Sequence, residues 1–151
     1  MAQDTLHVDI ISPERPLFSG DATALVAPNH DGEVGILPNH APMVSELGIG
    51  EVRITRNTAG GTRTEYFAVQ NGFLQTVKNK VIIITEQAKS PADIDEFKVN
   101  AEIEALIADS QASMSAEDRQ KRADRLRWLR TLARIFRHKL KGMDQHGGLE
   151  K

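Results

Sequence analysis

The chain has 151 residues, 40% of them hydrophobic, which is enough for one ordinary domain with an extension. It contains no cysteine, and this excludes a disulfide scaffold, a thiolate zinc site and a cysteine nucleophile. The net charge of -2 hides an asymmetry, because residues 91–115 carry 1 basic and 6 acidic side chains whereas residues 116–140 carry 9 basic and 3 acidic ones. This contrast between neighbouring segments indicates a functional role for the second part of the chain.

Two features bear on membranes and targeting. The first residues show no basic region followed by an apolar run, so we expect no targeting peptide. The longest aliphatic run, residues 81–84, is far too short to span a bilayer. We therefore expect a soluble chain that reaches a membrane only through a partner, with no direct insertion.

The first half of the chain has a two-residue hydrophobic period that is interrupted at short intervals by Gly, Pro or Asn. The expected strands are residues 5–11, 22–27, 34–37, 43–47, 51–56, 63–69, 73–77 and 81–85. Residues 57–61 and 78–80 have the composition of hairpin turns. Many short strands with tight turns predict an antiparallel β-sandwich or flattened barrel over residues 1–90.

Within this half, residues 31–43 interleave turn formers and two prolines with apolar residues. Pro38 and Pro42 each fix one backbone angle and drive the preceding residue toward an extended conformation. We therefore expect a rigid loop that presents a fixed contact surface. Asp31 and Glu33 are expected to be solvated loop carboxylates rather than an acid–base pair.

The pattern changes at residues 90–93, where Ser, Pro and Asp mark a helix start, and no Gly or Pro follows until Gly142. Two helices fit, over residues 93–109 and 116–140, and Ser115 with Asp118 is similar to a capping box at the second start. A short connection makes neighbouring helices antiparallel, so we predict a two-helix hairpin over residues 91–140. Residues 141–151 lack periodicity and are expected to form a disordered tail.

The first predicted helix is apolar on two sides. One side carries Ile94, Phe97, Ala101, Ala105 and Ala108, and the opposite side carries Val99, Ile103, Leu106 and Ile107. A small-residue stripe permits close approach and a bulky stripe fills space, so we expect this helix to lie between two packed surfaces.

The second predicted helix has an apolar seam of the kind that enters coiled-coil packing. Its members are Leu126, Leu129, Ala133, Phe136 and Leu140, with Trp128 and Ile135 extending the apolar side. Opposite the seam lie four arginines, which we call the arginine row: Arg127, Arg130, Arg134 and Arg137. Like charges at this spacing repel, so either an external anionic partner relieves them or the acidic first helix partly neutralises a solvated face.

The order of these parts resembles the epsilon subunit of F-type ATP synthases over about residues 4–140. The resemblance is carried by residues 6–14 with 17–20, by the loop at residues 32–43, and by residues 67–73 (FAVQNGF). It implies a non-catalytic central-stalk subunit whose sandwich contacts the gamma subunit and the c-subunit ring during proton-driven ATP synthesis. It also implies a peripheral location on the cytoplasmic side of the cell membrane. By the motif match, Glu33 and His40 belong to the ring-facing loop.

In this family the hairpin is regulatory, either folded on the sandwich or extended along gamma into the catalytic head. The resemblance implies that the extended hairpin inhibits ATP hydrolysis. The arginine row is then the regulatory basic face, and it meets an acidic segment of the catalytic beta subunits.

Some family members also bind ATP in the folded hairpin, through an Ile-Asp-x-x-Arg-Ala motif and two later arginines. The corresponding segment here is residues 94–99, with Lys98 in place of the planar arginine and the branched Val99 in place of alanine. The resemblance makes Asp95, Lys98, Arg130 and Arg134 the nucleotide-binding candidates. ATP would be a regulatory ligand, since no cofactor or metal is required.

Three other functions compete with this one. An independent enzyme would need a phosphate loop, a triad or a ligand cluster, and His30 and His40 lie in loops without a metal-ligand set. A nucleic-acid-binding module is suggested by the basic residues 119–141, but the β domain is net acidic, which leaves nonspecific phosphate binding. A lipid-bound basic helix is the last, although the narrow seam suits a protein groove better.

Overall fold

The computed structural model describes residues 4–109 and 114–147. The chain divides into two compact units, Met1–Lys89 and Ser90–Lys151. The sequence had indicated a boundary one residue later, and each unit is described below by itself.

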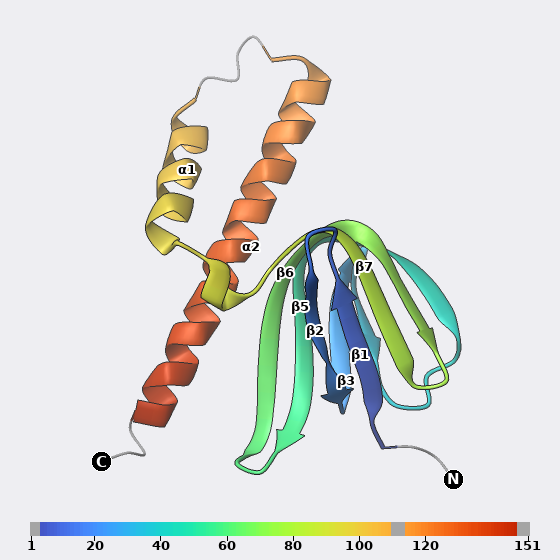
Figure 1. Ribbon diagram of the computed structural model, residues 1–151. Coiled ribbons are helices and arrows are strands. Elements are labelled where there is room, and N and C mark those ends of the chain that lie inside the picture. Colours follow the sequence, from blue (N-terminus) through green and yellow to red (C-terminus); the bar gives the residue numbers. More distant parts are fainter. Residues whose placement is uncertain (1–3, 110–113, 148–151) are drawn as a thin grey trace. The chain divides into compact units, whose positions relative to one another are not determined.

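The first unit is a β-sandwich, as predicted (Figure 1). Its strands are β1 (Leu6–Ile11), β2 (Pro16–Ala22), β3 (Ala24–Asn29), β4 (Gly32–Ile36), β5 (Met43–Thr58), β6 (Gly61–Val77) and β7 (Lys80–Lys89). They are hydrogen-bonded in the order β2-β1-β7-β6-β5-β3-β4. The pairing is antiparallel except between β1 and β7, which run parallel. The predicted antiparallel β-sandwich is confirmed, with this one parallel pair as an addition: no hairpin joins β1 to β7, so no turn dictates their relative direction.

The core of the sandwich follows the two-residue period that the sequence shows. On β1, Leu6, Val8 and Ile10 are fully buried, and alternate residues of the other strands join them. The remaining core residues are Ala22, Leu25, Ala27, Ile36, Leu47, Val52, Ile54, Phe67, Val69, Leu74, Val81 and Ile83. Alternation of this kind fixes the register, since a one-residue slip would turn every apolar side chain outward.

Two long strands replace four predicted ones. Residues 43–47 and 51–56 are parts of β5, and residues 63–69 and 73–77 are parts of β6. The glycines that suggested turns instead allow close approach of the backbone. A Cβ on Gly48 would lie 2.9 Å from the Asn29 carbonyl oxygen, and one on Gly50 would lie 2.8 Å from Pro28 Cβ. Sequence reasoning also missed β2, which begins at a proline on the edge of the sheet.

Both predicted hairpin turns are confirmed. Thr58 pairs with Gly61 across the first, and Val77 pairs with Lys80 across the second. Lys78 and Asn79 have φ of 50° and 62°, which is the left-handed conformation that a two-residue hairpin turn needs.

The second unit is the predicted helical hairpin, formed by a 3-10 turn η1 (Pro91–Asp93), α1 (Glu96–Ala108) and α2 (Ala116–Gly147). The helix α1 begins three residues later than expected because η1 comes first and Asp95 caps α1, its Oδ1 accepting from the Lys98 backbone N–H at 3.3 Å. The predicted cap of α2 is confirmed, since Ser115 Oγ accepts from the Asp118 backbone N–H at 3.1 Å.

The helix α2 continues through Gly147, whereas a disordered tail was expected from residue 141. A glycine in a helix interior costs only about 1 kcal/mol, so Gly142 does not end a helix that long-chain residues continue. The expected tail is therefore wrong over residues 141–147, and its end, residues 148–151, lies outside the described residues.

The burial of the two helices differs from the expectation. In α1, all of whose residues are described, Val99 alone is buried and Phe97 is 85% exposed, so the prediction of two packed surfaces is wrong. The alanine-rich side offers too little apolar area to bury. In α2 the centre of the predicted seam is buried, at Leu129 and Ala133, but Leu140 is 43% exposed. Because α1 has 13 residues and α2 has 32, the end of α2 has no helical neighbour within the hairpin.

Candidate functional site

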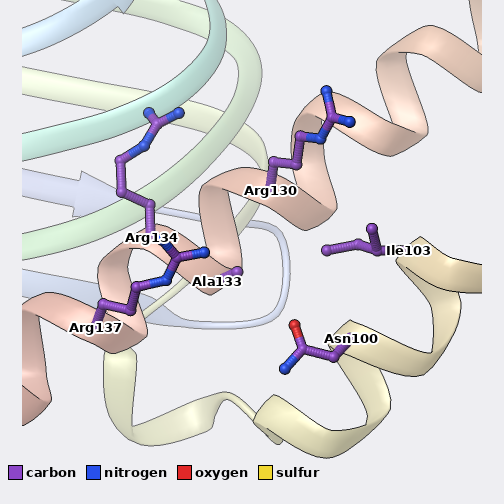
Figure 2. A pocket seen from close by; sticks show the side chains of 6 residues that line it. All are labelled: Asn100, Ile103, Arg130, Ala133, Arg134 and Arg137. Carbon is purple, nitrogen blue, oxygen red and sulfur yellow. The ribbon is translucent and has the colours of Figure 1, made fainter.

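A cavity of about 340 Å³ lies between the two helices of the hairpin (Figure 2). Its lining residues are Asn100 and Ile103 from α1, and Arg130, Ala133, Arg134 and Arg137 from α2. Residues three and four apart share a face of a helix, which places the α2 members together. A pocket of this size is within the range that small ligands use.

Each helix contributes a different chemistry to this cavity. Figure 2 shows the side chains of Asn100 and Ile103 directed toward α2, where Ala133 lies between the arginines, and the guanidinium ends of Arg130 and Arg134 project away from α1 in this view. Asn100 offers an amide, and the arginines offer planar guanidinium groups that bind phosphate or carboxylate oxygens with two parallel hydrogen bonds. The cavity is therefore suited to an anion.

The arginine row is exposed, and none of its four guanidinium groups makes a hydrogen bond or ion pair within the described part of the chain. The acidic α1 instead pairs with Arg125, whose Nη2 lies 2.6 Å from Glu102 Oε2. Arg122 donates to the Leu106 carbonyl. The described residues therefore do not show the first helix neutralising the arginine row, which was one of the two alternatives that the sequence left open.

Of the four nucleotide candidates, Arg130 and Arg134 line the cavity, whereas Asp95 and Lys98 do not. Asp95 is committed to capping α1, and Lys98 is exposed. Sequence reasoning left Arg137 out of this set, although its position three residues after Arg134 was a usable signal. It missed Asn100 altogether, because a lone asparagine in a helix carries no recognisable pattern.

The predicted contact loop is fixed at both of its ends. Glu33 lies on β4, so its expected place in a loop is wrong, whereas its carboxylate is solvent-exposed as expected, with 51% of the side chain accessible. Arg53 Nη1 donates to its Oε2 at 2.9 Å. At the other end, the Asn39 backbone N–H donates to Asn79 Oδ1 at 2.5 Å, and His40 Nδ1 lies 2.6 Å from the Ala41 carbonyl oxygen. The contact between Asn39 and Asn79 holds this end of the loop against the turn between β6 and β7.

The sandwich also carries an exposed apolar row that crosses three neighbouring strands. Ile11 on β1 pairs with Ile84 on β7, and Ile84 pairs with Phe73 on β6. Their exposed fractions are 41%, 57% and 59%, and Val44 on β5, 68% exposed, lies diagonally from Phe73. Contiguous exposed apolar side chains on a folded domain mark an interface.

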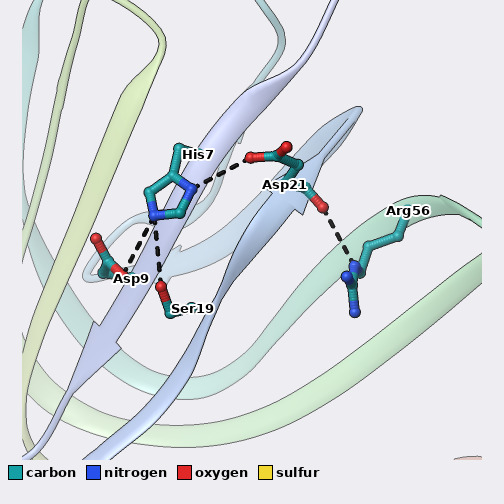
Figure 3. Close-up of polar contacts among 5 residues, drawn as sticks. All are labelled: His7, Asp9, Ser19, Asp21 and Arg56. Carbon is teal, nitrogen blue, oxygen red and sulfur yellow. Dashed lines mark hydrogen bonds and ion pairs between the residues drawn. The ribbon is translucent and has the colours of Figure 1, made fainter.

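A polar cluster on β1 and β2 has the composition of a catalytic triad (Figure 3). His7 Nδ1 lies 3.2 Å from Asp21 Oδ1, and His7 Nε2 lies 3.4 Å from Ser19 Oγ and 3.5 Å from Asp9 Oδ1. His7 and Asp21 are 44% and 72% exposed, and Asp9 shares the nitrogen that a serine nucleophile would need. We assign the cluster to stabilising the edge strand β2, which Arg56 also ties to β5 by donating to the Asp21 carbonyl at 3.2 Å.

The described residues contain no group of three His, Cys, Asp or Glu side chains arranged to hold a metal ion. Over the same part of the chain, no helix is both long enough and apolar enough to cross a bilayer.

The comparison with known proteins identifies the family. Residues 5–91 match the family model described as ATP synthase, delta/epsilon chain, beta-sandwich domain. The ATP synthase epsilon chain of Nitrosococcus oceani is 38% identical over 80% of this chain and 79% of its own length. That of Alkalilimnicola ehrlichii is 35% identical over 88% and 96%.

Solved structures share the fold. A chain of the Euglena gracilis mitochondrial ATP synthase matches with a TM-score of 0.73 and 21% identity, over 87% of this chain and 81% of that one. A chain of the Tetrahymena thermophila mitochondrial ATP synthase matches with a TM-score of 0.56 and 14% identity, over 89% and 98%. The family match and the curated relatives together confirm the resemblance seen in the sequence: this chain belongs to the ATP synthase epsilon chains.

Proposed function

We propose that this chain is a non-catalytic subunit of the central stalk, and that its sandwich couples the gamma rotor to the ring of c subunits. The observation that carries the proposal is the exposed row of Ile11, Phe73 and Ile84, a contiguous apolar surface of the kind that protein interfaces bury. The similar Euglena chain belongs to an assembly described as OSCP/F1/c-ring, and the similar Tetrahymena chain to a central stalk and c-ring. On this proposal the chain is held peripherally at the cytoplasmic face of the membrane by its partners.

Substituting Phe73→Asp should abolish co-purification of the chain with the gamma-containing head. Placing one charge in a buried apolar contact costs several kcal/mol, whereas Phe73 is 59% exposed in the free chain and its loss there costs little. The measurement is the amount of chain retained by the affinity-purified head. Thr62→Asp, on the exposed far end of the same strand, is the matched control and should be retained in full. Equal retention of both variants would show that the apolar row does not contribute to binding of the gamma subunit.

Glu33 and His40 are proposed to form the surface of the sandwich that contacts the c-subunit ring. Both side chains are held by contacts of their own, which suits a surface that must keep its shape while it transmits torque. The stiff loop between them adds the exposed Leu37 to this surface.

The hairpin is proposed to restrain ATP hydrolysis. The four exposed guanidinium groups of the arginine row have no partner among the described residues, so an acidic segment of the catalytic beta subunits would relieve their mutual repulsion. When the hairpin extends, this contact would oppose rotation in the hydrolytic direction.

ATP is proposed as a regulatory ligand of the cavity between α1 and α2. Arg130, Arg134 and Arg137 would hold the phosphates, with Asn100 as an additional hydrogen-bonding group. Titration of the full chain with ATP in a calorimeter should give a binding signal that the Arg130→Gln/Arg134→Gln variant lacks. Each lost charge-assisted bond is worth about 1.5–3 kcal/mol, so the loss of affinity should exceed about 100-fold. No heat at millimolar ATP would refute nucleotide binding and leave the inhibitory role intact.

A further inference from the structure

We propose that Arg53 is a positioning residue for the ring contact: its guanidinium, anchored by Glu51, holds the Glu33 carboxylate in one place on the edge strand. This inference rests on the proposed contact between Glu33 and the ring. Arg53 lies on a strand, outside the contact loop and outside the family motifs quoted above.

The geometry is that of a two-pronged clamp. Arg53 Nη1 lies 2.9 Å from Glu33 Oε2, and Arg53 Nη2 lies 3.3 Å from Glu33 Oε1. The same Nη1 lies 2.8 Å from Glu51 Oε1. A planar guanidinium that meets both oxygens of a carboxylate fixes its orientation as well as its position.

The clamp reaches across a strand. Arg53 on β5 pairs with Val26 on β3, and Glu33 on the edge strand β4 pairs with Pro28 on β3. The Arg53 side chain therefore spans β3 to reach the last strand of the sheet. A carboxylate on an edge strand would otherwise be free to swing into solvent.

Glu51 makes the clamp rigid. Its side chain is 9% exposed, on the same face of β5 as Arg53, while the Arg53 side chain is 31% exposed. The hydrogen bond that Arg53 donates to Glu33, opposed by burial and reinforced by Glu51, raises the pKa of Arg53, and the guanidinium stays charged. Two carboxylates face one guanidinium, and the cluster keeps one net negative charge at the surface. This negative cluster suits a segment of the ring that presents N–H donors or a cation. Because Arg53 already holds the Glu33 carboxylate in place, Glu33 need not be ordered when the ring binds.

The test uses membranes that carry the complete ATP synthase. Because the chain has no cysteine, Leu37→Cys places a single benzophenone label in the contact loop, where Leu37 is 63% exposed. The yield of photo-crosslink to the c subunit is measured with Glu33→Gln, with Arg53→Gln and with both. Each single substitution should lower the yield by a similar factor, up to about five-fold for a partly exposed ion pair, and the double variant should lower it no further. Arg53→Lys, which keeps the charge and loses the fork, should restore part of the yield.

Arg56→Gln is the matched control. Arg56 is on the same strand, its side chain is 34% exposed, and it pairs with Glu65 rather than with Glu33. It should lower the urea midpoint of the purified chain about as much as Arg53→Gln does, and leave the crosslink yield unchanged. A yield that simply follows the urea midpoint across all variants would overturn the positioning role.

The remaining outcomes separate the two proposals. If Glu33→Gln leaves the yield unchanged, the ring contact of Glu33 is wrong, and the role of Arg53 is wrong with it. If Glu33→Gln lowers the yield while Arg53→Gln does not, or if the two effects multiply in the double variant, only the positioning role is wrong.

Discussion

Removing residues 91–151 should raise ATP hydrolysis by the assembled complex about three- to ten-fold, which corresponds to an inhibitory bias of roughly 0.7–1.4 kcal/mol. The sandwich should survive the deletion, because its core residues all belong to the first unit. Coupling should survive too, since the apolar row and the contact loop lie in that unit. The measurement is ATP hydrolysis together with ATP-driven proton pumping in the same membranes.

A charge-only variant separates the arginine row from the rest of the hairpin. Replacing all four arginines with glutamine keeps the helix and removes like-charge repulsion along it, so α2 should remain folded. If the row makes the inhibitory contact, this variant should match the deletion. Hydrolysis that stays at the level of the intact complex in both cases would contradict the regulatory role. A rise in the deletion alone would place the contact elsewhere on the hairpin.

Substituting Gly72→Ala should destabilise the purified chain by about 3–5 kcal/mol, a large part of the stability of an ordinary domain. Gly72 has φ of 120°, a conformation that residues with a Cβ rarely adopt. An added Cβ would lie 2.0 Å from the Ile84 carbonyl oxygen and 2.8 Å from Thr85 Cα, both of them backbone atoms of β7 that cannot rotate away. The neighbouring Asn71 carbonyl, 2.8 Å from Thr85 Oγ1, holds β6 in place at this point.

The free energy of unfolding in urea measures this effect. Gly60→Ala is the control, because a Cβ there meets nothing within 4 Å, and its cost should stay within about 0.5 kcal/mol. An unchanged unfolding midpoint for Gly72→Ala would mean that β6 and β7 can move apart at residue 72 without loss of stability.

The sequence predicts those parts of the fold that depend on local pattern. The alternation of Leu6, Val8 and Ile10 identifies β1 and its buried face, and Ser115 identifies the start of α2. The prediction of two separate strands in place of β5 was wrong, and the reason lies in a contact with another strand. Gly48 is a glycine because the carbonyl of Asn29, from another strand, passes close to it, and no pattern within residues 43–58 shows this.

The candidate sites show the same limit. Helical spacing alone brings Arg130, Arg134 and Arg137 to one cavity, so the basic half of that site could be predicted. Asp95, which the motif match proposes for the same site, lies just before a helix and caps its backbone instead of lining the cavity. The clamp on Glu33 could not be predicted, because Arg53 reaches it across an intervening strand.

The most direct test of the stalk function is ATP-driven proton pumping by membranes depleted of this chain and then resupplied with it. The intact chain and the Thr62→Asp variant should restore pumping, whereas Phe73→Asp, which loses the apolar contact, should not. Full restoration of pumping by Phe73→Asp would contradict the claim that this face of the sandwich joins the rotor to the ring.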